Sequence, residues 1–337
     1  LKEAEPLLTA GQVMAYAQLP VVTKQACSGD CSKMLAQGHG KKKMKLAAKK
    51  DNVVAVTTPN LTFKIDRSTG LISEYAYNGK SLLGEGGTLK PNFWRAPTDN
   101  DMGAGLQKKF KAWKNPQMNL KNIDVKKDKK TNSVTILTSF DMPEVQGQMD
   151  ITYVVFANTG AVKVTEDFKA TEGAKVSDMF RFGMLMQMPY TMEKSNYYGR
   201  GPIENYSDRK DCMRIGVYTD DADNQYFPYI RPQESGTKSD IRWWKQTDAT
   251  GLGLQVKSCT PFYASAIHFD TEELDDGDDK EQRHSFDLKK SKFTNLFLDS
   301  AHMGVGGENS WGAWPLEKYR VHYGNKTFTF TLIPQGK

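Results

Sequence analysis

The chain has 337 residues, of which 38% are hydrophobic and 11% aromatic, so it is long and apolar enough to bury a large core. No apolar run approaches the roughly 20 residues that cross a bilayer, and the first residues lack the basic and apolar pattern of a signal peptide, so we expect no membrane partner. The net charge of +6 is local, because residues 24–50 carry eight lysines and one aspartate (8 − 1 = +7), which leaves 6 − 7 = −1 for the rest. A nucleic-acid partner for the main body is therefore not expected.

The first 50 residues differ in composition from the rest. Residues 11–22 alternate apolar and polar positions, which predicts one strand. Because a single strand is not stable alone, we expect 1–22 to be the tail of a preceding β-sandwich domain. Residues 23–50, rich in Lys, Ser and Gly, are predicted to be a Lys-rich linker. Its Cys27 and Cys31 are compatible with a local disulfide or with free thiols, and without the second pair of a zinc motif we assign no metal.

Short strands separated by turns begin after residue 51. Ala157-Asn158-Thr159-Gly160 is a hairpin turn signal, and near the C-terminus three apolar residues alternate with threonines, as in a half-buried antiparallel strand. The expected strands are, in chain order, 53–56, 61–65, 71–77, 134–137, 151–156, 162–164 and 327–332.

One helix is predicted, over Met102–Lys114. Leu106, Phe110 and Trp113 recur there at helical spacing, and the run Asp99-Asn100-Asp101 just before them offers an N-cap. Because little else has a helical period, the pattern favours an all-β fold of two large packed sheets over residues 51–337.

A tryptophan on a glycine-rich loop is the sequence feature that points to a ligand. The string at 302–311 reads His-Met-Gly-Val-Gly-Gly-Glu-Asn-Ser-Trp. Glycines permit backbone angles and close approaches that a Cβ would block, and the indole of Trp311 has the area and the polarised edge to stack on a sugar face.

Four strings in this chain resemble the C-terminal domain, or small-chain region, of the large bacterial β-galactosidases of glycoside hydrolase family 2. They are the ten residues at 94–103 (Trp-Arg-Ala-Pro-Thr-Asp-Asn-Asp-Met-Gly), the twelve at 198–209 (Tyr-Gly-Arg-Gly-Pro-Ile-Glu-Asn-Tyr-Ser-Asp-Arg), the six at 231–236 (Arg-Pro-Gln-Glu-Ser-Gly) and the string at 302–311. Residues 10–15 also resemble the last strand of the small β-sandwich that precedes this domain in the family. The resemblance covers the whole chain in order.

This resemblance implies a β-supersandwich of the galactose mutarotase-like fold for 51–337. It places the catalytic glutamates of a retaining mechanism on a separate, upstream (β/α)₈ barrel of the same protein, so no catalytic residue is expected in this chain. It implies a β-galactoside as substrate, no cofactor in this region, and a full-length enzyme that is a homo-oligomer and compatible with Mg²⁺ or Na⁺. The substrate-binding residues implied at the rim of the active site are Trp311, Asn309, Arg95, Asp99 and Asn100.

The acidic side chains of the motifs are predicted to be structural. Retaining hydrolysis needs two carboxyl groups about 5–5.5 Å apart, and no motif pairs any here. We therefore expect bidentate arginine contacts to hold them. The carboxylates are Glu204, Asp208, Glu234, Asp99 and Asp101, and the arginines are Arg95, Arg200, Arg209 and Arg242. The separate acidic run 275–279 lacks the spacing of a calcium loop and is predicted to be solvated.

Three functional hypotheses remain open at this point. The first is the C-terminal portion of a β-galactosidase, inactive by itself. The second is a stand-alone epimerase of the mutarotase type, which needs a His acid and a Glu base, for example His268 or His302 with Glu234. The third is a non-catalytic carbohydrate-binding or assembly module. The orphan strand predicted within 1–22 argues against the second, and the sequence does not distinguish a cytoplasmic from a periplasmic location.

Overall fold

The computed structural model describes residues 1–19, 21, 42–48, 52–309 and 312–336, and the chain divides into two units, Leu1–Asp30 and Cys31–Lys337. In the first unit, residues 1–19 contain one isolated bridge, between Glu5 and Leu8, and no strand. The strand expected over 11–22 is therefore not formed in its described part, because a strand needs a neighbour to complete its hydrogen bonds. The assignment of 1–22 to a preceding domain stays a prediction.

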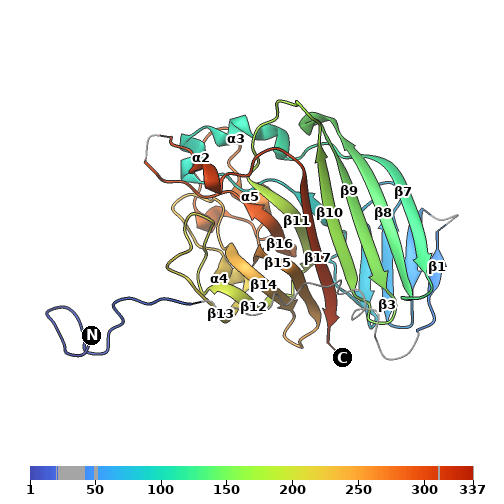
Figure 1. Cartoon of the computed structure of the whole chain (residues 1–337), viewed down its shortest axis with the longest axis horizontal. Helices are drawn as coiled ribbons and strands as arrows, with labels where there is room; N and C mark the ends of the chain where they lie inside the picture. Colours follow the sequence, from blue (N-terminus) through green and yellow to red (C-terminus); the bar gives the residue numbers. More distant parts are fainter. Residues whose placement is uncertain (20, 22–41, 49–51, 310–311, 337) are drawn as a thin grey trace. The chain divides into compact units, whose positions relative to one another are not determined.

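The second unit contains two antiparallel sheets (Figure 1). The smaller sheet has five strands in sequential order, and its buried positions alternate with partly exposed ones, as expected for a sheet with one face on the core. Its strands are β1 (Lys45–Ala47), β2 (Val53–Thr57), β3 (Leu61–Asp66), β4 (Ile72–Tyr77) and β5 (Lys80–Ser81).

The larger sheet has twelve strands. Nine follow one path in the order β13-β12-β14-β15-β17-β10-β9-β8-β7, and β16, β11 and β6 branch from it at β15. The strands are β6 (Leu89–Asn92), β7 (Asn119–Asp128), β8 (Ser133–Met142), β9 (Gly147–Phe156), β10 (Val162–Ala170), β11 (Arg181–Pro189), β12 (Lys194–Gly201), β13 (Arg214–Asp221), β14 (Lys238–Thr247), β15 (Gly253–Ile267), β16 (Phe293–His302) and β17 (Lys326–Gln335).

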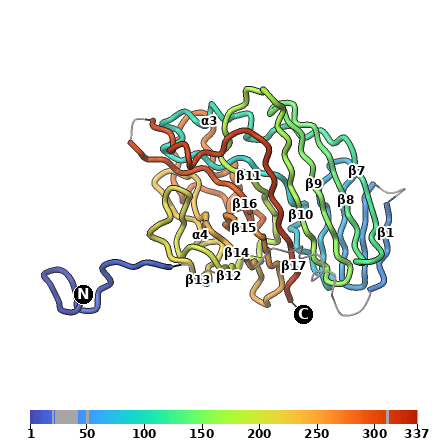
Figure 2. The backbone as a smooth tube through the Cα atoms, viewed as in Figure 1, coloured from blue at the N-terminus to red at the C-terminus, as the bar shows by residue number. Residues whose placement is uncertain are grey.

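The long strand β15 is where the larger sheet forks. One side of β15 pairs with β14. On the other side, Gly253–Lys257 pairs with β17, whereas Tyr263–Ile267 pairs with β16. The C-terminal strand β17, red in Figure 2, therefore lies between β15 and β10, which are far from it in sequence. The strands β6 and β16 belong to the same branch of the sheet. The motif strings at 94–103 and 302–311 begin at or just after the ends of these two strands.

The five-stranded sheet packs on the β7–β10 part of the larger sheet. The rings of Phe63 on β3 and Tyr153 on β9 have centroids 5.9 Å apart, and the Tyr75 hydroxyl donates to the Gly160 carbonyl across 2.8 Å. All three aromatic side chains are fully buried. The all-β class predicted from the sequence is confirmed, as is the hairpin turn between β9 and β10.

Two local predictions were wrong. Only residues 42–48 of the linker predicted over 23–50 are described, and in that part the prediction was wrong, because it contains the strand β1, which pairs with β2 while Met44 and Leu46 pack on the core. The helix predicted over Met102–Lys114 is replaced by three short turns of helix, because Gly105 takes a left-handed conformation (φ 68°) that interrupts the α-helix. These turns still bury the predicted apolar residues Leu106, Phe110 and Trp113.

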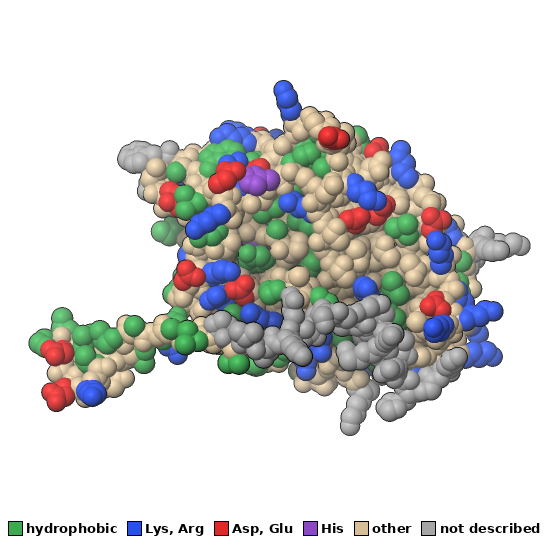
Figure 3. Space-filling model, viewed as in Figure 1, with side chains coloured by type: hydrophobic (Ala, Val, Ile, Leu, Met, Phe, Trp, Pro, Cys, Tyr) green, Lys and Arg blue, Asp and Glu red, His purple; other side chains and the backbone are tan. Residues whose placement is uncertain are grey.

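All helical segments of the described residues are short. They are α2 (Asp99–Gly103), α3 (Leu106–Lys109), η1 (Lys111–Trp113), η2 (Pro143–Val145), α4 (Ala222–Gln225), α5 (Thr271–Leu274), η3 (Ser285–Asp287) and η4 (Glu317–Tyr319). Over the described ranges, none has the length and apolar character to cross a membrane. On the face drawn in Figure 3, basic and acidic side chains are interspersed, in keeping with the small net charge outside 24–50.

A buried glutamate lies on β10 in the interior of the larger sheet. The side chain of Glu166 is fully buried, and both of its carboxyl oxygens lack a hydrogen-bond partner among the described residues. Burial, reinforced by the charge of Asp299, raises the pKa of Glu166 well above its usual value. Since the folded-state pKa exceeds the unfolded value of about 4.3, the proton stabilises the fold below that value, and this stabilisation is lost as pH rises through the folded-state pKa.

We expect Glu166→Gln to remove this loss of stability. The free energy of unfolding of the variant should match that of the parent chain near pH 4 and exceed it increasingly towards pH 8, by up to about 1.4 kcal/mol per pH unit. Urea unfolding of both chains across this range measures the difference, with the exposed Glu172→Gln as control. A difference that does not change with pH would contradict the assignment of a raised pKa.

Candidate functional site

The candidate site is built on loops that lie next to strands of the larger sheet. Residues 93–98 connect β6 to α2, residues 202–209 follow β12, residues 226–236 precede β14, and residues 303–309 follow β16. Hydrogen bonds join these loops directly. For example, the Asn100 side chain donates to the Val305 carbonyl across 3.0 Å, which brings α2 beside the last of them.

Arg95 joins two of these loops from inside. Its guanidinium is fully buried and makes two bonds to the Asp101 carboxylate, at 3.0 and 2.9 Å. It also donates to the carbonyls of Met303 and Gly304, at 2.7 and 2.9 Å. Burial alone lowers the pKa of Arg95, but the adjacent Asp101 carboxylate outweighs it and the net pKa is raised. The side chain is therefore a permanently charged link between residues 95–101 and the glycine-rich loop.

Asp101 also begins helix α2. Its carboxylate accepts the Thr98 backbone N–H at 2.9 Å, and the Thr98 hydroxyl accepts the Asp101 backbone N–H at 3.2 Å. This reciprocal capping places the N-cap at Thr98, one residue before the predicted Asp99-Asn100-Asp101 run. A single carboxylate thus sets both the start of the helix and the position of Arg95.

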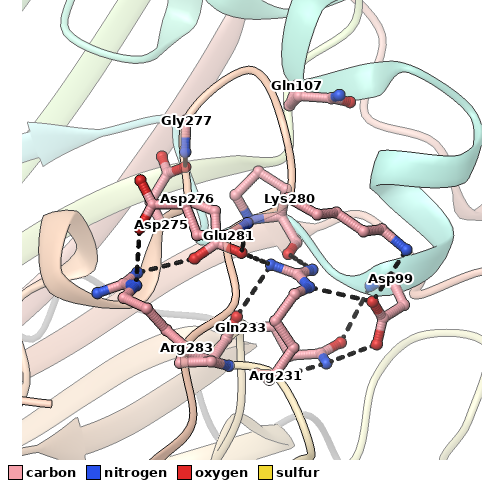
Figure 4. Close-up of polar contacts among 12 residues, drawn as sticks. Asp99, Gln107, Arg231, Gln233, Asp275, Asp276, Gly277, Lys280, Glu281 and Arg283 are labelled. Carbon is pink, nitrogen blue, oxygen red and sulfur yellow. Dashed lines mark hydrogen bonds and ion pairs between the residues drawn. The ribbon is translucent and has the colours of Figure 1, made fainter. Parts of the chain in front are cut away.

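Asp99 lies at the surface of this loop, in the polar network of Figure 4. Its carboxylate is 3.1 Å from the Arg231 guanidinium and 3.3 Å from Lys280, and the Gln233 amide donates to it at 3.0 Å. Partial burial raises the pKa of Asp99, but the hydrogen bonds from Gln233 and Arg231 outweigh this, so the net pKa is lowered. Its side chain is 54% exposed, so the ionised carboxylate still reaches solvent.

Asp208 binds the backbone of the glycine-rich loop. Its carboxylate accepts the backbone N–H groups of Val305 and Gly306, at 3.0 and 2.9 Å. A Cβ at Gly304 would collide with this carboxylate, and Gly306 and Gly307 have φ of +73° and +94°. The glycines are therefore required here, as the sequence predicted, for one close approach and two left-handed conformations.

The predicted substrate-binding residues separate into two groups. Arg95 is buried and positions the loops without reaching solvent, so it cannot touch a sugar directly. Asp99, Asn100 and Asn309 are exposed on the loops that Arg95 joins. Trp311 lies outside the described residues, as do Cys27 and Cys31, so their predicted roles stay predictions.

The carboxylates predicted to be structural are bonded, but several of their partners differ from the prediction. Arg95 holds Asp101 and Arg209 holds Glu204, as expected. The predicted arginine partners of the other three were wrong. Asp99 pairs with Arg231, Glu234 lies 3.8 Å from Arg181, and Asp208 binds backbone amides, while Arg200 and Arg242 both contact Asp240.

A buried charged cluster beneath these loops was missed in the sequence. Arg181 on β11 lies 3.0 Å from Asp299 on β16, and both are essentially unexposed. Burial raises the pKa of Asp299 to about 7, opposed by the charge of Arg181 and reinforced by that of Glu234. Arg181 and Asp299 are over 100 residues apart in the chain, and no local motif marks either of them.

The histidines of the epimerase hypothesis are not placed for catalysis. Burial, and then the nearby charges of Arg181 and Arg95, hold the pKa of His302 well below its usual value, so this ring is neutral and 3% exposed. His268 is also buried, and its two ring nitrogens contact Asp223 at 2.8 Å and Thr294 at 3.0 Å. Neither imidazole is open to a sugar.

The prediction that the acidic run at 275–279 is solvated was wrong for two of its residues. The Asp275 and Asp276 side chains are 1% and 0% exposed. Asp276 lies 2.8 Å from both Arg231 and Arg283, and it connects these two arginines in the network of Figure 4. Over the described residues, no group of three or more His, Cys, Asp or Glu side chains could hold a metal ion.

A cavity of about 200 Å³ lies beside the first loop. Asn92, Trp94, Lys114 and Asp275 contribute to its walls, and the Trp94 indole N–H donates to Asp275 at 2.8 Å. None of the described residues predicted to bind substrate lines it. The exposed loop surface, and not this cavity, is therefore the candidate site.

Comparison with known proteins supplies the family. Residues 57–332 match the family described as the β-galactosidase small chain. The chain belongs to this family. It is 30% identical over 286 residues to a β-galactosidase of Priestia megaterium, covering 84% of this chain and 27% of that protein. It is 34% identical over 222 residues to a β-galactosidase of Lactobacillus delbrueckii subsp. bulgaricus, covering 65% and 21%. The resemblance to the small-chain region that was stated from the sequence is confirmed over residues 57–332.

The small-chain region spans about a quarter of the length of these relatives, 27% and 21% of the two proteins above. Among solved structures, the chain is similar to a galactose mutarotase related enzyme from Lactobacillus acidophilus, with a TM-score of 0.40 and 8% identity, covering 87% of this chain and 98% of that one. The family assignment depends on the sequence match over 57–332.

We expect Arg95→Met to destabilise the chain by about 3–5 kcal/mol, because it leaves the buried Asp101 carboxylate without its cation. Lys108→Met is the matched control, since Lys108 pairs with Asp279 at an exposed position, where water screens the pair and its loss should change the stability little. Denaturant unfolding of the two variants measures both values. Equal effects would mean that Arg95 does not carry the loop connection.

Proposed function

We propose that this chain is the C-terminal portion of a β-galactosidase that hydrolyses terminal non-reducing β-D-galactose residues. In this proposal the chain completes the rim of the active site and binds carbohydrate. The acid/base and nucleophile glutamates of a retaining mechanism lie upstream, in a (β/α)₈ barrel of the same protein. The observation that carries the proposal is the family match over residues 57–332, together with the much greater length of the β-galactosidase relatives.

The exposed loops supply groups suited to a sugar. Asp99 and Asn100 on one loop and Asn309 on the other offer a carboxylate and two amides, which together accept and donate hydrogen bonds to hydroxyls. Trp311 adds an indole for stacking on an apolar sugar face. Arg95 links the loop of Asp99 and Asn100 to Met303 and Gly304, and Asp208 holds the next two backbone amides, so the two loops are held together up to Gly306 before a sugar arrives.

The carboxylates of this chain are poorly suited to the bond-breaking step. A general acid and a nucleophile must both face the glycosidic bond. Asp101 is 1% exposed and bound to Arg95, and Glu204 is bound to Arg209 and to the Gly236 backbone. Asp99 is exposed, but its lowered pKa makes it a poor proton donor. This supports a catalytic centre in another part of the protein.

Other components of the working enzyme belong to the same proposal. Mg²⁺ or Na⁺, where the full-length enzyme uses one, is held outside the described part of this chain, and the full-length protein assembles as a homo-oligomer. The proposal includes no nucleic acid and no membrane as partner.

Hydrolysis of a nitrophenyl β-galactoside tests the proposed function. We expect the full-length gene product to release nitrophenol and this chain alone to release none. Activity in this chain alone would contradict the assignment of the catalytic residues to the upstream part, because the carboxylates of this chain would then perform the chemistry. No activity in either protein would favour a carbohydrate-binding or assembly module.

We expect Trp311→Ala in the full-length enzyme to weaken substrate binding by roughly 1–3 kcal/mol, if sugar stacking resembles stacking of a base on an aromatic ring. The matched control is Trp243→Ala, an indole on β14 that lies 5.8 Å from the Lys245 ammonium and outside the candidate site. Steady-state KM and kcat of both variants provide the comparison. Unchanged kinetics for Trp311→Ala would contradict the stacking role.

A further inference from the structure

An exposed apolar face adjoins the candidate site. Four large apolar side chains there point into solvent, although each could contribute to a core if it were covered. Their exposed fractions are 60% for Ile203, 55% for Phe227, 86% for Ile230 and 85% for Phe286. Exposed apolar side chains that gather on one surface mark sites of interaction more often than chance placement does.

Contacts among these residues and their neighbours join the loops that carry Phe227, Ile230 and Phe286. His284 stacks near Phe286, with ring centroids 5.7 Å apart, and its Nδ1 contacts the Ile230 carbonyl at 2.8 Å. The Phe227 ring lies 4.7 Å from the Tyr229 ring. We call Ile203, Phe227, Tyr229, Ile230, His284 and Phe286 the apolar face.

A layer of polar groups holds the apolar face in place from beneath. The Glu204 carboxylate, next to Ile203 in the chain, accepts hydrogen bonds from the Tyr229 hydroxyl, from Arg209 at 2.5 Å and from the Gly236 backbone N–H at 2.8 Å. The Glu204 side chain is only 10% exposed. The polar groups beneath the apolar side chains are therefore hydrogen-bonded inside the protein, while the apolar side chains face solvent. Because these hydrogen bonds already order the loops, binding a partner costs little conformational entropy.

The apolar face continues into the network around Asp99. Ile230 directly precedes Arg231, which contacts both Asp99 and Asp276. His284 directly follows Arg283, the other arginine bound to Asp276. Anything that covers the apolar face therefore lies next to the loop on which the proposed sugar contacts stand.

We propose that the apolar face is the surface on which the upstream part of the same β-galactosidase polypeptide docks. About three quarters of the length of the relatives lies outside the region that this chain matches, so a large covering body exists in proteins of this family. The centre of the face is apolar with charged groups at its margin, which is the composition of a stable protein interface. The inference rests on the proposed function in one respect, that the catalytic part precedes this chain in the same polypeptide.

Site-specific photo-cross-linking of the full-length protein tests the docking. We expect Phe286→p-benzoylphenylalanine to form, on irradiation, a cross-link that peptide mass spectrometry maps within the same polypeptide to a residue upstream of Leu1. The control, Lys126→p-benzoylphenylalanine on the exposed strand β7, should form none. Both substituted positions are exposed, so the variants should fold like the parent.

The other outcomes overturn the inference. A cross-linked band of twice the polypeptide mass would assign the face to a second copy, and a cross-link to an unrelated protein would assign it to a separate partner. Absence of any cross-link at Phe286 would mean that the face stays in solvent. The readout does not depend on activity, so a full-length protein that cross-links upstream but hydrolyses no galactoside would refute the proposed function and leave the docking intact.

Discussion

One buried guanidinium connects the two loops on which the candidate site stands. Arg95 makes four hydrogen bonds inside the protein, two to Asp101 and one each to the carbonyls of Met303 and Gly304. A buried charge of this kind is stable only when every partner is in place, so the position of each loop depends on that of the other. Asp208, on the loop that follows β12, binds the backbone amides of the same glycine-rich loop and so connects a third loop to it.

This arrangement divides the polar residues of the motifs by function. Those that are buried serve as supports, as Asp101 and Glu204 do beneath their loops. Those that remain exposed, Asp99 and Asn100 among them, stand on a surface that the supports have already ordered. In the proposed function, a site of this type binds and orients the sugar, and the chemical step belongs to groups in another part of the protein. The neighbouring apolar face gives that part a place to dock.

The sequence predicted the repeating features of the fold and missed those that depend on long-range contacts. Alternation identified strands such as β3 and β17, because a period of two reflects one buried face. The helix over Met102–Lys114 was wrong because Gly105 reverses the backbone at a position where the apolar spacing alone continues. The strand β1 was hidden in a lysine-rich segment, although the alternation of Met44 and Leu46 was a local signal for it.

The site was predictable to the extent that its motifs are local. The glycines and Asp99-Asn100 were recognisable as strings, and the resemblance to the β-galactosidases gave them a role. Arg181 and Asp299 were missed, because they are far apart in the chain and only the paired strands β11 and β16 bring them together. Pairing of carboxylates with arginines was predicted correctly as a principle, but the choice of partner required the topology.

A structure of the full-length protein with a bound galactoside inhibitor tests the central claim most directly, which is that this chain binds the sugar while another part performs the chemistry. The account predicts that the sugar contacts the loops carrying Asp99, Asn100 and Asn309, with two carboxylates from the upstream region flanking the glycosidic bond. A sugar flanked by carboxylates of this chain, or bound away from these loops, would contradict it.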